Sequence, residues 1–428
     1  MNFFRKHFSR HKGKYINSSI FIFTSVITLE LGSFLTLQIL KKDGVNLFTE
    51  AAECTYFQML MPHPYLGYVN GPRKTCEDSI EVINKLGFVG EELPPKRSNE
   101  NFYVMLVGGS VAQQLGHIPI REENGKIASY SFLGEHLNKC YLPPKPYKEF
   151  KLSVVAMGGW TQPQNAISTL LFGERAHAIV NLDGFNEHYA FKNPYAALGL
   201  PSNNFSYLMK LKYTGNPLLG FLISLVSDIT LLQYNNPLLK YSNTLNLIRK
   251  TANRISVIFN PNKNYWREIF KGDRKISYYG QFALPKTWDS KMIADYNFTQ
   301  YKKYLEITSQ IGKVNKTKTA FFLQPVPALH KELTEQEKLV PIDYEKVYEK
   351  LEKEFLSLKE KGLEVHSLTK IYKDIKDNVY GDDIHASYYQ KSPNKYESIG
   401  YEIMAKSITE IIAEKWGFTK KSRSNMCQ

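Results

Sequence analysis

Cysteine is scarce in this chain, and no two cysteines form a CxxC pair. Only four occur in 428 residues, too few for a disulfide scaffold. No Cys/His cluster has the spacing of a zinc site, so we expect no bound metal. A composition with 43% hydrophobic and 22% charged residues also excludes a disordered, collagen-like or coiled-coil chain.

Acidic residues are outnumbered by basic ones, 41 to 55, and the formal net charge is +14. Residues 1–14 contain five bases and no acid, which leaves +9 (14 minus 5) on the rest of the chain. Such an excess suits an anionic surface, an anionic glycan or a nucleic acid. Because the bases are scattered and no nucleic-acid-binding motif is present, we expect a solvated basic surface and no nucleic-acid partner.

Hydrophobic runs long enough to cross a membrane are missing, with one exception near the N-terminus. The mean hydropathy of −0.35 excludes a multi-span membrane protein. The exception is Ile20–Leu40, whose 21 residues carry Glu30 as their only charge. As a helix this run is about 31 Å long, enough to span a bilayer core. Its thirteen Ile, Leu, Val and Phe residues favour membrane insertion by a free energy of roughly 4–8 kcal/mol, whereas Glu30 opposes it by roughly 3 kcal/mol.

This run predicts a retained transmembrane anchor. We assign residues 1–14 to a cytoplasmic tail, 15–41 to the anchor and 42–100 to a lead-in segment. Five bases precede the run and only two follow it at once, so the positive-inside rule places the rest of the chain outside the cytoplasm, in a periplasm or at the cell surface. No A-x-A-like site follows, which argues against a cleaved signal peptide. A buried or interfacial helix is the alternative.

In an oxidising compartment Cys54 and Cys76 are able to form a disulfide. Free buried thiols are the other interpretation, and the sequence does not decide between them.

Five short apolar runs have the character of buried parallel strands separated by helices. They are Phe102–Val107, Leu152–Ala156, Ala178–Leu182, Thr319–Leu323 and Leu363–Leu368. Helical spacing occurs between them and at the end of the chain, in Ser131–Lys139, Gln164–Gly173 and Ile399–Trp416. This alternation predicts one α/β domain with a mostly parallel five-stranded sheet over residues 101–418, followed by a basic tail, 419–428.

An insertion of helical character interrupts the alternation at about residues 195–300. Within it, Pro217–Gln233 is apolar apart from Asp228, with Asn216 as a possible N-cap. Seventeen residues are short for a membrane span. We interpret the segment as a buried helix of an inserted cap, with a helix resting on the membrane as the alternative.

Four sequence blocks carry side chains that are able to take part in catalysis. Each block lies at a predicted strand end or before the last helix. They are GGSVA with Ser110, GGWTQPQ with Gly159, GFNE with Asn186, and DDIH with Asp382 and His385. The carboxyl ends of parallel strands share one edge of a sheet, so these loops are expected to converge. Taken alone, each block is weak: Ser110 can simply be an N-cap, and a single D-x-x-H is common.

In this order, the four blocks resemble the SGNH hydrolase (GDSL esterase/lipase) superfamily, whose blocks centre on Ser, Gly, Asn and His. The resemblance covers roughly residues 60–415 outside the insertion. It implies a flavodoxin-like three-layer fold, and a nucleophilic Ser110 activated by His385, whose ring Asp382 orients. It also implies an oxyanion hole made by the N–H groups of Ser110 and Gly159 and the amide of Asn186, with no cofactor.

Two residues depart from the family pattern. Gly109 replaces the Asp of the GDSL form, and Glu187 replaces the Asp that usually follows the third block's Asn. Neither change removes a proposed catalytic group. Asp383 competes with Asp382 as the orienting acid, but the D-x-x-H spacing favours Asp382. Three further side chains near strand ends are weaker candidates for substrate contact: Trp160, His188 and Gln324.

The resemblance implies a serine esterase, and the predicted anchor places it outside the cytoplasm. The anchor and the basic ectodomain suit an O-acylated cell-surface glycan as substrate, although a lipid ester or a small ester also fits. Transfer of the acyl group to a sugar hydroxyl by the same residues is one alternative. A catalytically inactive glycan-binding or envelope-assembly protein is the other. The natural ester and the oligomeric state stay open.

Overall fold

The computed structural model describes most of the chain outside the insertion. The described residues are 20–39, 60–70, 83–121, 127–191, 241–258, 287–340, 342–392 and 395–421, with single positions between 221 and 239. Two compact units are present. One consists of Met1–Thr55, Lys74–Glu77 and Met209–Lys263, and the other of Tyr56–Arg73, Asp78–Leu208 and Asn264–Gln428.

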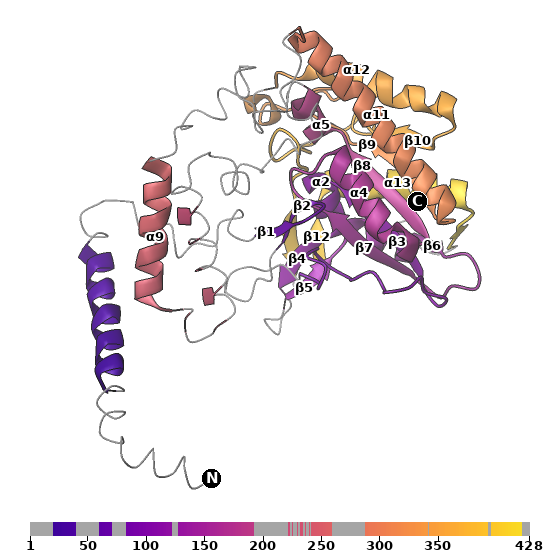
Figure 1. Cartoon of the computed structure of the whole chain (residues 1–428). Helices are drawn as coiled ribbons and strands as arrows, with labels where there is room; N and C mark the ends of the chain where they lie inside the picture. Colours follow the sequence, from indigo (N-terminus) through magenta and orange to yellow (C-terminus); the bar gives the residue numbers. More distant parts are fainter. Residues whose placement is uncertain are drawn as a thin grey trace. The chain divides into compact units, whose positions relative to one another are not determined.

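A five-stranded parallel sheet is the centre of the second unit (Figure 1). Its strands are β3 (Phe102–Gly108), β7 (Phe150–Ala156), β8 (Ala178–Asp183), β9 (Lys318–Leu323) and β10 (Val365–Ser367). The spatial order is β10-β9-β8-β3-β7. Counted along the chain from the β7 edge this is 2-1-3-4-5, the flavodoxin-like doubly wound order. The predicted α/β class and parallel five-stranded sheet are confirmed.

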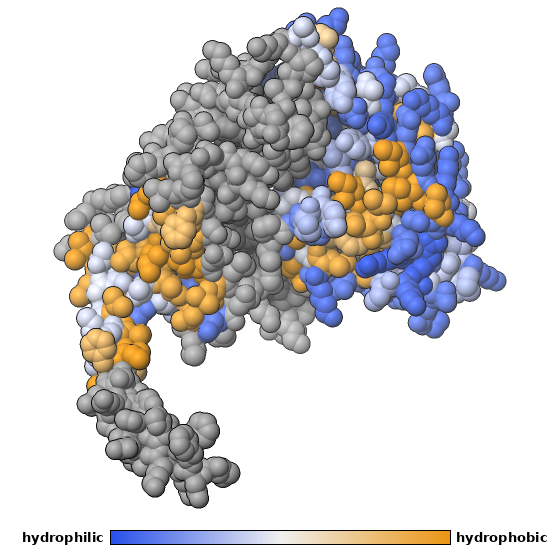
Figure 2. All heavy atoms as spheres, viewed as in Figure 1, coloured by the Kyte–Doolittle hydropathy of each residue, from blue (hydrophilic) through white to orange (hydrophobic). Residues whose placement is uncertain are grey.

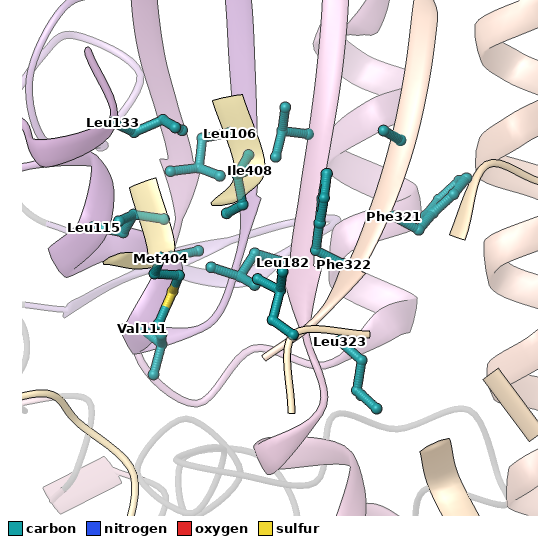
Figure 3. Packing of buried hydrophobic residues seen from close by; sticks show 14 of the residues in the cluster. Leu106, Val111, Leu115, Leu133, Leu182, Phe321, Phe322, Leu323, Met404 and Ile408 are labelled. Atoms are coloured by element: carbon teal, nitrogen blue, oxygen red, sulfur yellow. The ribbon is translucent and has the colours of Figure 1, made fainter. Parts of the chain in front are cut away.

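Both faces of the sheet are covered, which explains why its strands are apolar throughout. Val104 and Leu106 of β3 belong to one group of buried side chains, and Met105 and Val107 belong to a second. The first group also contains Leu115, Leu133, Met404 and Ile408, which approach the sheet together in Figure 3. The second contains Trp160 and Phe172. Side chains of successive residues thus point into separate cores.

Helices pack on both faces. They are α2 (Ser110–Gly116), α3 (Phe132–Cys140), α4 (Gln162–Phe172), α5 (Phe185–Phe191), α11 (Ser290–Val314), α12 (Glu345–Leu356) and α13 (Ile399–Trp416). Helix α13 has the predicted bounds because both ends carry a signal: Ser398 accepts a hydrogen bond from the Tyr401 N–H, and Gly417 ends the helix at φ 73°. Helix α11 begins inside the range expected for the insertion and packs against α4.

Short elements complete the second unit. Three antiparallel pairs are formed by β1 (Leu60–His63) with β2 (Gly67–Asn70), β4 (Ile118–Arg121) with β5 (Ile127–Tyr130), and β11 (Tyr389–Ser392) with β12 (Lys395–Glu397). A fourth pair joins β6 (Tyr141–Leu142) to β13 (Thr419–Lys420). The 3-10 helices are η3 (Gly173–Arg175), η4 (Glu337–Leu339) and η5 (Ser357–Lys361). The expected tail therefore begins with a strand, β13, which pairs with β6.

The first unit contains the N-terminal helix Ile20–Ile39 and helix α9 (Asn243–Ile258). Among the described helices, Ile20–Ile39 is the one long and apolar enough to cross a membrane, and it is almost entirely exposed. Figure 2 shows the resulting apolar surface of this unit. Of the predicted helix 217–233 the structure describes a few helical positions, among which Ile229 is buried and Phe221 and Leu232 are exposed.

One cysteine, Cys140, lies among the described residues. Cys54 and Cys76 lie outside the described residues, so their pairing is not decided. Cys140, at the end of α3, is disulfide-bonded. A disulfide is typical of proteins that fold in an oxidising compartment.

Candidate active site

Ser110 is the first residue of α2, directly after the end of β3. The connection between strand and helix is only Gly109, and its neighbour Gly108 cannot carry a side chain. A Cβ on Gly108 would lie 2.0 Å from the carbonyl oxygen of Leu182 in β8. This close approach seats Ser110 between the ends of β3 and β8, where the strand order reverses and doubly wound proteins bind their ligands. Its N–H, at the first helical position, has no acceptor within the helix.

Asn186 joins the loops that follow three adjacent strands. It lies in the first turn of α5, after β8, and its Nδ2 donates to the carbonyl oxygen of Trp160 after β7, 2.9 Å away. The same Nδ2 lies 2.5 Å from where a Cβ on Gly109 would stand. A side chain at position 109 would therefore collide with Asn186. This contact is a physical reason for glycine at position 109.

The turn after β7 is held by two hydrogen bonds to the backbone of Gly158, the residue before Gly159. The N–H of Gly158 donates to Oε1 of Gln113 in α2, and Tyr68 donates its hydroxyl to the Gly158 carbonyl. Gly159 itself has φ 81°, a conformation that favours glycine. In the described part of the chain its N–H has no acceptor. The turn thus offers one N–H without an acceptor, one residue before the Trp160 carbonyl that binds Asn186.

Asp382 and His385 form a hydrogen-bonded pair on the loop before α13. Oδ2 of Asp382 lies 2.7 Å from Nδ1 of His385, and its Oδ1 accepts from the N–H groups of Ile384 and His385 at 2.9 and 2.6 Å. Burial raises the pKa of Asp382, but the hydrogen bonds from His385 and Ile384 outweigh burial, so the pKa lies below its usual value. This carboxylate stays ionised at neutral pH and fixes the ring so that Nε2 is left free.

Tyr401 of α13 connects this loop to the helix that begins with Ser110. Its hydroxyl donates to Oε1 of Gln114, 2.5 Å away, and accepts from the N–H of Ala386. Gln114 lies four residues after Ser110 and hence on the same face of α2. Nevertheless, no hydrogen bond joins Ser110 to His385 among the described residues, and Nε2 of His385 is shielded from solvent without a partner.

Tyr344 connects the same loop to α5. Its hydroxyl donates to the carbonyl oxygen of Asp383 at 2.7 Å, and its ring stacks on His188 with centroids 4.7 Å apart. His188 also packs edge-on against Phe185, at 4.7 Å. Four segments far apart in sequence therefore meet at one edge of the sheet: those of Ser110, Gly159, Asn186 and the Asp382–His385 pair.

The three weaker candidates are all buried. Trp160 packs edge-on against Phe88 with centroids 5.7 Å apart, and His188 lies against aromatic rings as described. Gln324 follows β9 and donates its backbone N–H to the Asp183 carbonyl, while its Nε2 is buried without a partner. The structure thus gives Trp160 and His188 packing contacts, and none of the three lies on the surface.

Glu187, the second departure from the family pattern, stabilises the turn that carries Asn186. Its Oε2 accepts the N–H of Gly184 at 3.0 Å. Asp183 lies nearby and accepts from the hydroxyl of Tyr301 at 3.1 Å and from the amide of Asn181 at 2.7 Å. Burial raises the pKa of Asp183 to about 7, and burial together with Asp183 raises that of Glu187. Sequence reasoning missed this buried acid pair.

Glu337 was also missed, although it holds the start of the loop that carries Asp382 and His385. Its Oε1 accepts the N–H groups of Val379 and Tyr380 at 2.9 and 3.0 Å. Its Oε2 pairs with the buried ammonium of Lys331 at 2.7 Å. A signal was available, because Thr334 and Glu337 have the T-x-x-E spacing of a capping box and bond reciprocally. The T-x-x-E spacing does not predict the contact between Glu337 and Val379, which lies 42 residues away.

Among the described residues, no group of three or more His, Cys, Asp or Glu side chains is placed to hold a metal ion. In comparisons with known proteins, no family model matches the chain and no curated protein matches its sequence.

Proposed function

We propose that the chain is a serine esterase of the SGNH type, with Ser110 as nucleophile, His385 as general base and Asp382 as the acid that orients it. The observation that carries the proposal is the Asp382–His385 pair. With Nδ1 bonded to a carboxylate at 2.7 Å, the free ring nitrogen is Nε2, the atom that must take a proton from a serine hydroxyl. The Tyr401 contacts hold this loop beside the face of α2 that carries Ser110.

The chemistry follows from these groups. Nε2 of His385 takes the proton as Oγ of Ser110 attacks the ester carbonyl, and Asp382 stabilises the imidazolium that forms. The N–H groups of Ser110 and Gly159 and the Nδ2–H of Asn186 not used by Trp160 donate hydrogen bonds to the developing oxyanion. The intermediate collapses as His385 returns the proton to the leaving alcohol. Water, activated by the same His385, then releases the acid and restores the hydroxyl.

The reaction needs a Ser110–His385 hydrogen bond that is not formed here. Such bonds are often long in enzymes without substrate and tighten when the substrate is bound. Since His385 Nε2 has no other partner to give up, forming that bond satisfies a buried polar atom rather than breaking an existing contact.

An O-acylated cell-surface glycan is the substrate class we favour. The apolar helix Ile20–Ile39 near the N-terminus supports an anchored protein. The disulfide at Cys140 supports a domain outside the cytoplasm, and the positive net charge suits a polyanionic surface. Other esters remain compatible with the same catalytic groups.

The test is labelling of the full chain in detergent with a fluorophosphonate probe, which forms a covalent bond with an activated serine. Labelling of the wild type, and not of Ser110→Ala or His385→Ala, is the expected result, together with turnover of p-nitrophenyl acetate. Product analysis with a sugar acceptor then separates hydrolysis from acyl transfer.

The competing function is a non-catalytic glycan-binding or assembly protein, and the unformed Ser110–His385 hydrogen bond is the observation in its favour. A folded wild type that neither labels nor turns over the ester would support it. Binding of an acylated glycan by Ser110→Ala with unchanged affinity would then be the positive result for this function.

A further inference from the structure

Two polar side chains of the N-terminal helix, Glu30 and Ser33, are hydrogen-bonded to the start of α9. Glu30, the only charged residue of this helix, accepts hydrogen bonds from the hydroxyl of Ser242 and, at 2.7 Å, from the N–H of Asn243. One turn further, Ser33 donates to the hydroxyl of Thr244 at 3.3 Å and is itself buried. The helix therefore presents its carboxylate to the first turn of α9.

The remaining surface of the N-terminal helix is exposed and mostly apolar, and the hydroxyls of its exposed Thr24, Thr28 and Thr36 donate to carbonyls of the same helix. Phe21, Phe23 and Leu35 are exposed by 72%, 67% and 59%. These exposures suit a helix surrounded by lipid tails, with its hydrogen bonds to α9 at Glu30 and Ser33.

The position of Glu30 sets a depth. Ile20–Ile39 contains 20 residues and is about 30 Å long, the thickness of a bilayer core. Glu30 is the eleventh of them, so about 15 Å of helix lies on either side of it. If the helix spans the membrane, its carboxylate and the first turn of α9 both lie near the centre.

Helix α9 has the charge distribution that such a position requires. Its first six residues, Asn243–Ile248, are uncharged, and Ile248 is exposed. Its charges are Arg249, Lys250 and Arg254, about 9 to 17 Å from its start. A helix beginning at the membrane centre reaches the headgroups after about 15 Å. Long basic side chains that start deeper than this extend outward to the headgroups. The chain after α9 returns to the compact unit that contains the sheet.

We propose that α9 enters the bilayer beside the anchor, with its first turn capped by Glu30 at the depth of the membrane centre and its basic half directed to the headgroups of the outer leaflet. Glu30 and the start of α9 satisfy each other's hydrogen-bonding groups. Backbone N–H groups at a helix start need acceptors where water is absent, and a carboxylate in a membrane needs donors. The proposal rests on the anchor spanning the membrane and does not depend on the catalytic chemistry.

The pairing is tested by cysteine cross-linking of the full chain in membranes. Ser33→Cys with Thr244→Cys places two thiols where two hydroxyls lie 3.3 Å apart. We expect a cross-link in most molecules after mild oxidation, identified as linked peptides by mass spectrometry. The matched control is Leu31→Cys with Thr244→Cys, since Leu31 is exposed on another face of the anchor. Equal cross-linking of both pairs, or of neither, overturns the pairing.

The depth is tested separately with an environment-sensitive fluorophore on Ile248→Cys or Arg254→Cys, in vesicles of phosphatidylcholine and phosphatidylglycerol. A nitroxide at carbon 12 of the acyl chain is expected to quench the label at 248 several-fold more than the label at 254. A headgroup nitroxide should give the reverse order. Quenching of both labels by aqueous iodide, even with the 33–244 cross-link formed, would place α9 outside the bilayer and overturn the proposal.

Discussion

Oδ2 of Asp382 lies 2.7 Å from Nδ1 of His385, whereas the adjacent Asp383 bonds to the hydroxyl of Tyr344 through its backbone carbonyl. Asp382 therefore contacts His385 through its carboxylate, whereas the contact of Asp383 with Tyr344 does not involve its carboxylate. The D-x-x-H spacing favours the first of them, and the structure shows why: residues 382 and 385 face each other across a tight loop closed by the Gly381–His385 hydrogen bond.

The first prediction separates these two acids. Asp382→Asn removes the charge that holds the His385 ring and stabilises its imidazolium, so kcat/KM for p-nitrophenyl acetate should fall by about 10²- to 10⁴-fold. Asp383→Asn is the matched control and should change it by less than about threefold, because it keeps the backbone carbonyl. Equal losses in the two variants would contradict the assigned roles.

A second prediction concerns the contact between Gly109 and Asn186. Gly109→Ala places a Cβ 2.5 Å from Nδ2 of Asn186, and we expect a cost of about 1–3 kcal/mol in unfolding free energy. Because Asn186 is displaced, the rate should fall by about 10²- to 10³-fold, as for loss of an oxyanion donor.

The control for this contact is a double-mutant cycle. Asn186→Ala removes the obstructing amide, so adding Gly109→Ala to it should cost much less stability than Gly109→Ala alone. Additive costs would show that the strain at position 109 has another source.

The third prediction tests Glu337, which holds the backbone at Val379 and Tyr380. Glu337→Gln leaves the ammonium of Lys331 buried without a counter-charge, so the unfolding free energy should fall by about 3–5 kcal/mol. Replacing Lys331 with Met in the same variant removes the unpaired charge and should restore part of that loss. Chemical denaturation monitored by circular dichroism measures both.

Glu335→Gln is the matched control for Glu337. Glu335 pairs with Lys338 on the surface, where both side chains are more than half exposed. Solvent screens such a pair, so the unfolding midpoint should not move. A similar loss in the two variants would mean that the Lys331–Glu337 pair has no special role.

Much of the fold could be predicted because the relevant signals are local. The five sheet strands are buried on both faces, so each appears as a continuous apolar run, and α13 carries its own cap residues at Ser398 and Gly417. The order of the four blocks could be read in the same way, since each follows a strand or precedes a helix.

The missing parts depend on contacts between segments far apart in sequence. Tyr401 reaches Gln114 across 287 positions, and Glu30 reaches Asn243 across 213. No periodicity marks either partner, because a single tyrosine or glutamate on a helix looks like an ordinary residue. The buried acids Asp183 and Glu187 were missed for a related reason: acids are rarely fully buried, so a sequence pattern places them at the surface.

The last prediction uses the pH dependence of stability. Burial raises the pKa of Asp183 to about 7, well above the value of about 3.9 in an unfolded chain. Between about pH 4 and 7 the folded state therefore holds a proton that the unfolded state has lost. Stability falls as pH rises through this window, by about 1.4 kcal/mol per pH unit for one such proton, and levels off above it.

Asp183→Asn should remove the part of that slope that comes from Asp183, while Glu187, whose pKa burial also raises, keeps its own contribution. Its carbonyl oxygen can still accept from Asn181 and Gln162, while its amide faces the hydroxyl oxygen of Tyr301. Urea unfolding at pH 4.5, 5.5, 6.5 and 7.5 should show the variant losing less stability than the wild type as pH rises. Asp295→Asn is the control, because the hydrogen bond from Lys350 lowers the pKa of Asp295 and its titration falls below the window. If the curve for Asp183→Asn also runs parallel to the wild type, Asp183 is ionised in the fold and the raised pKa is wrong.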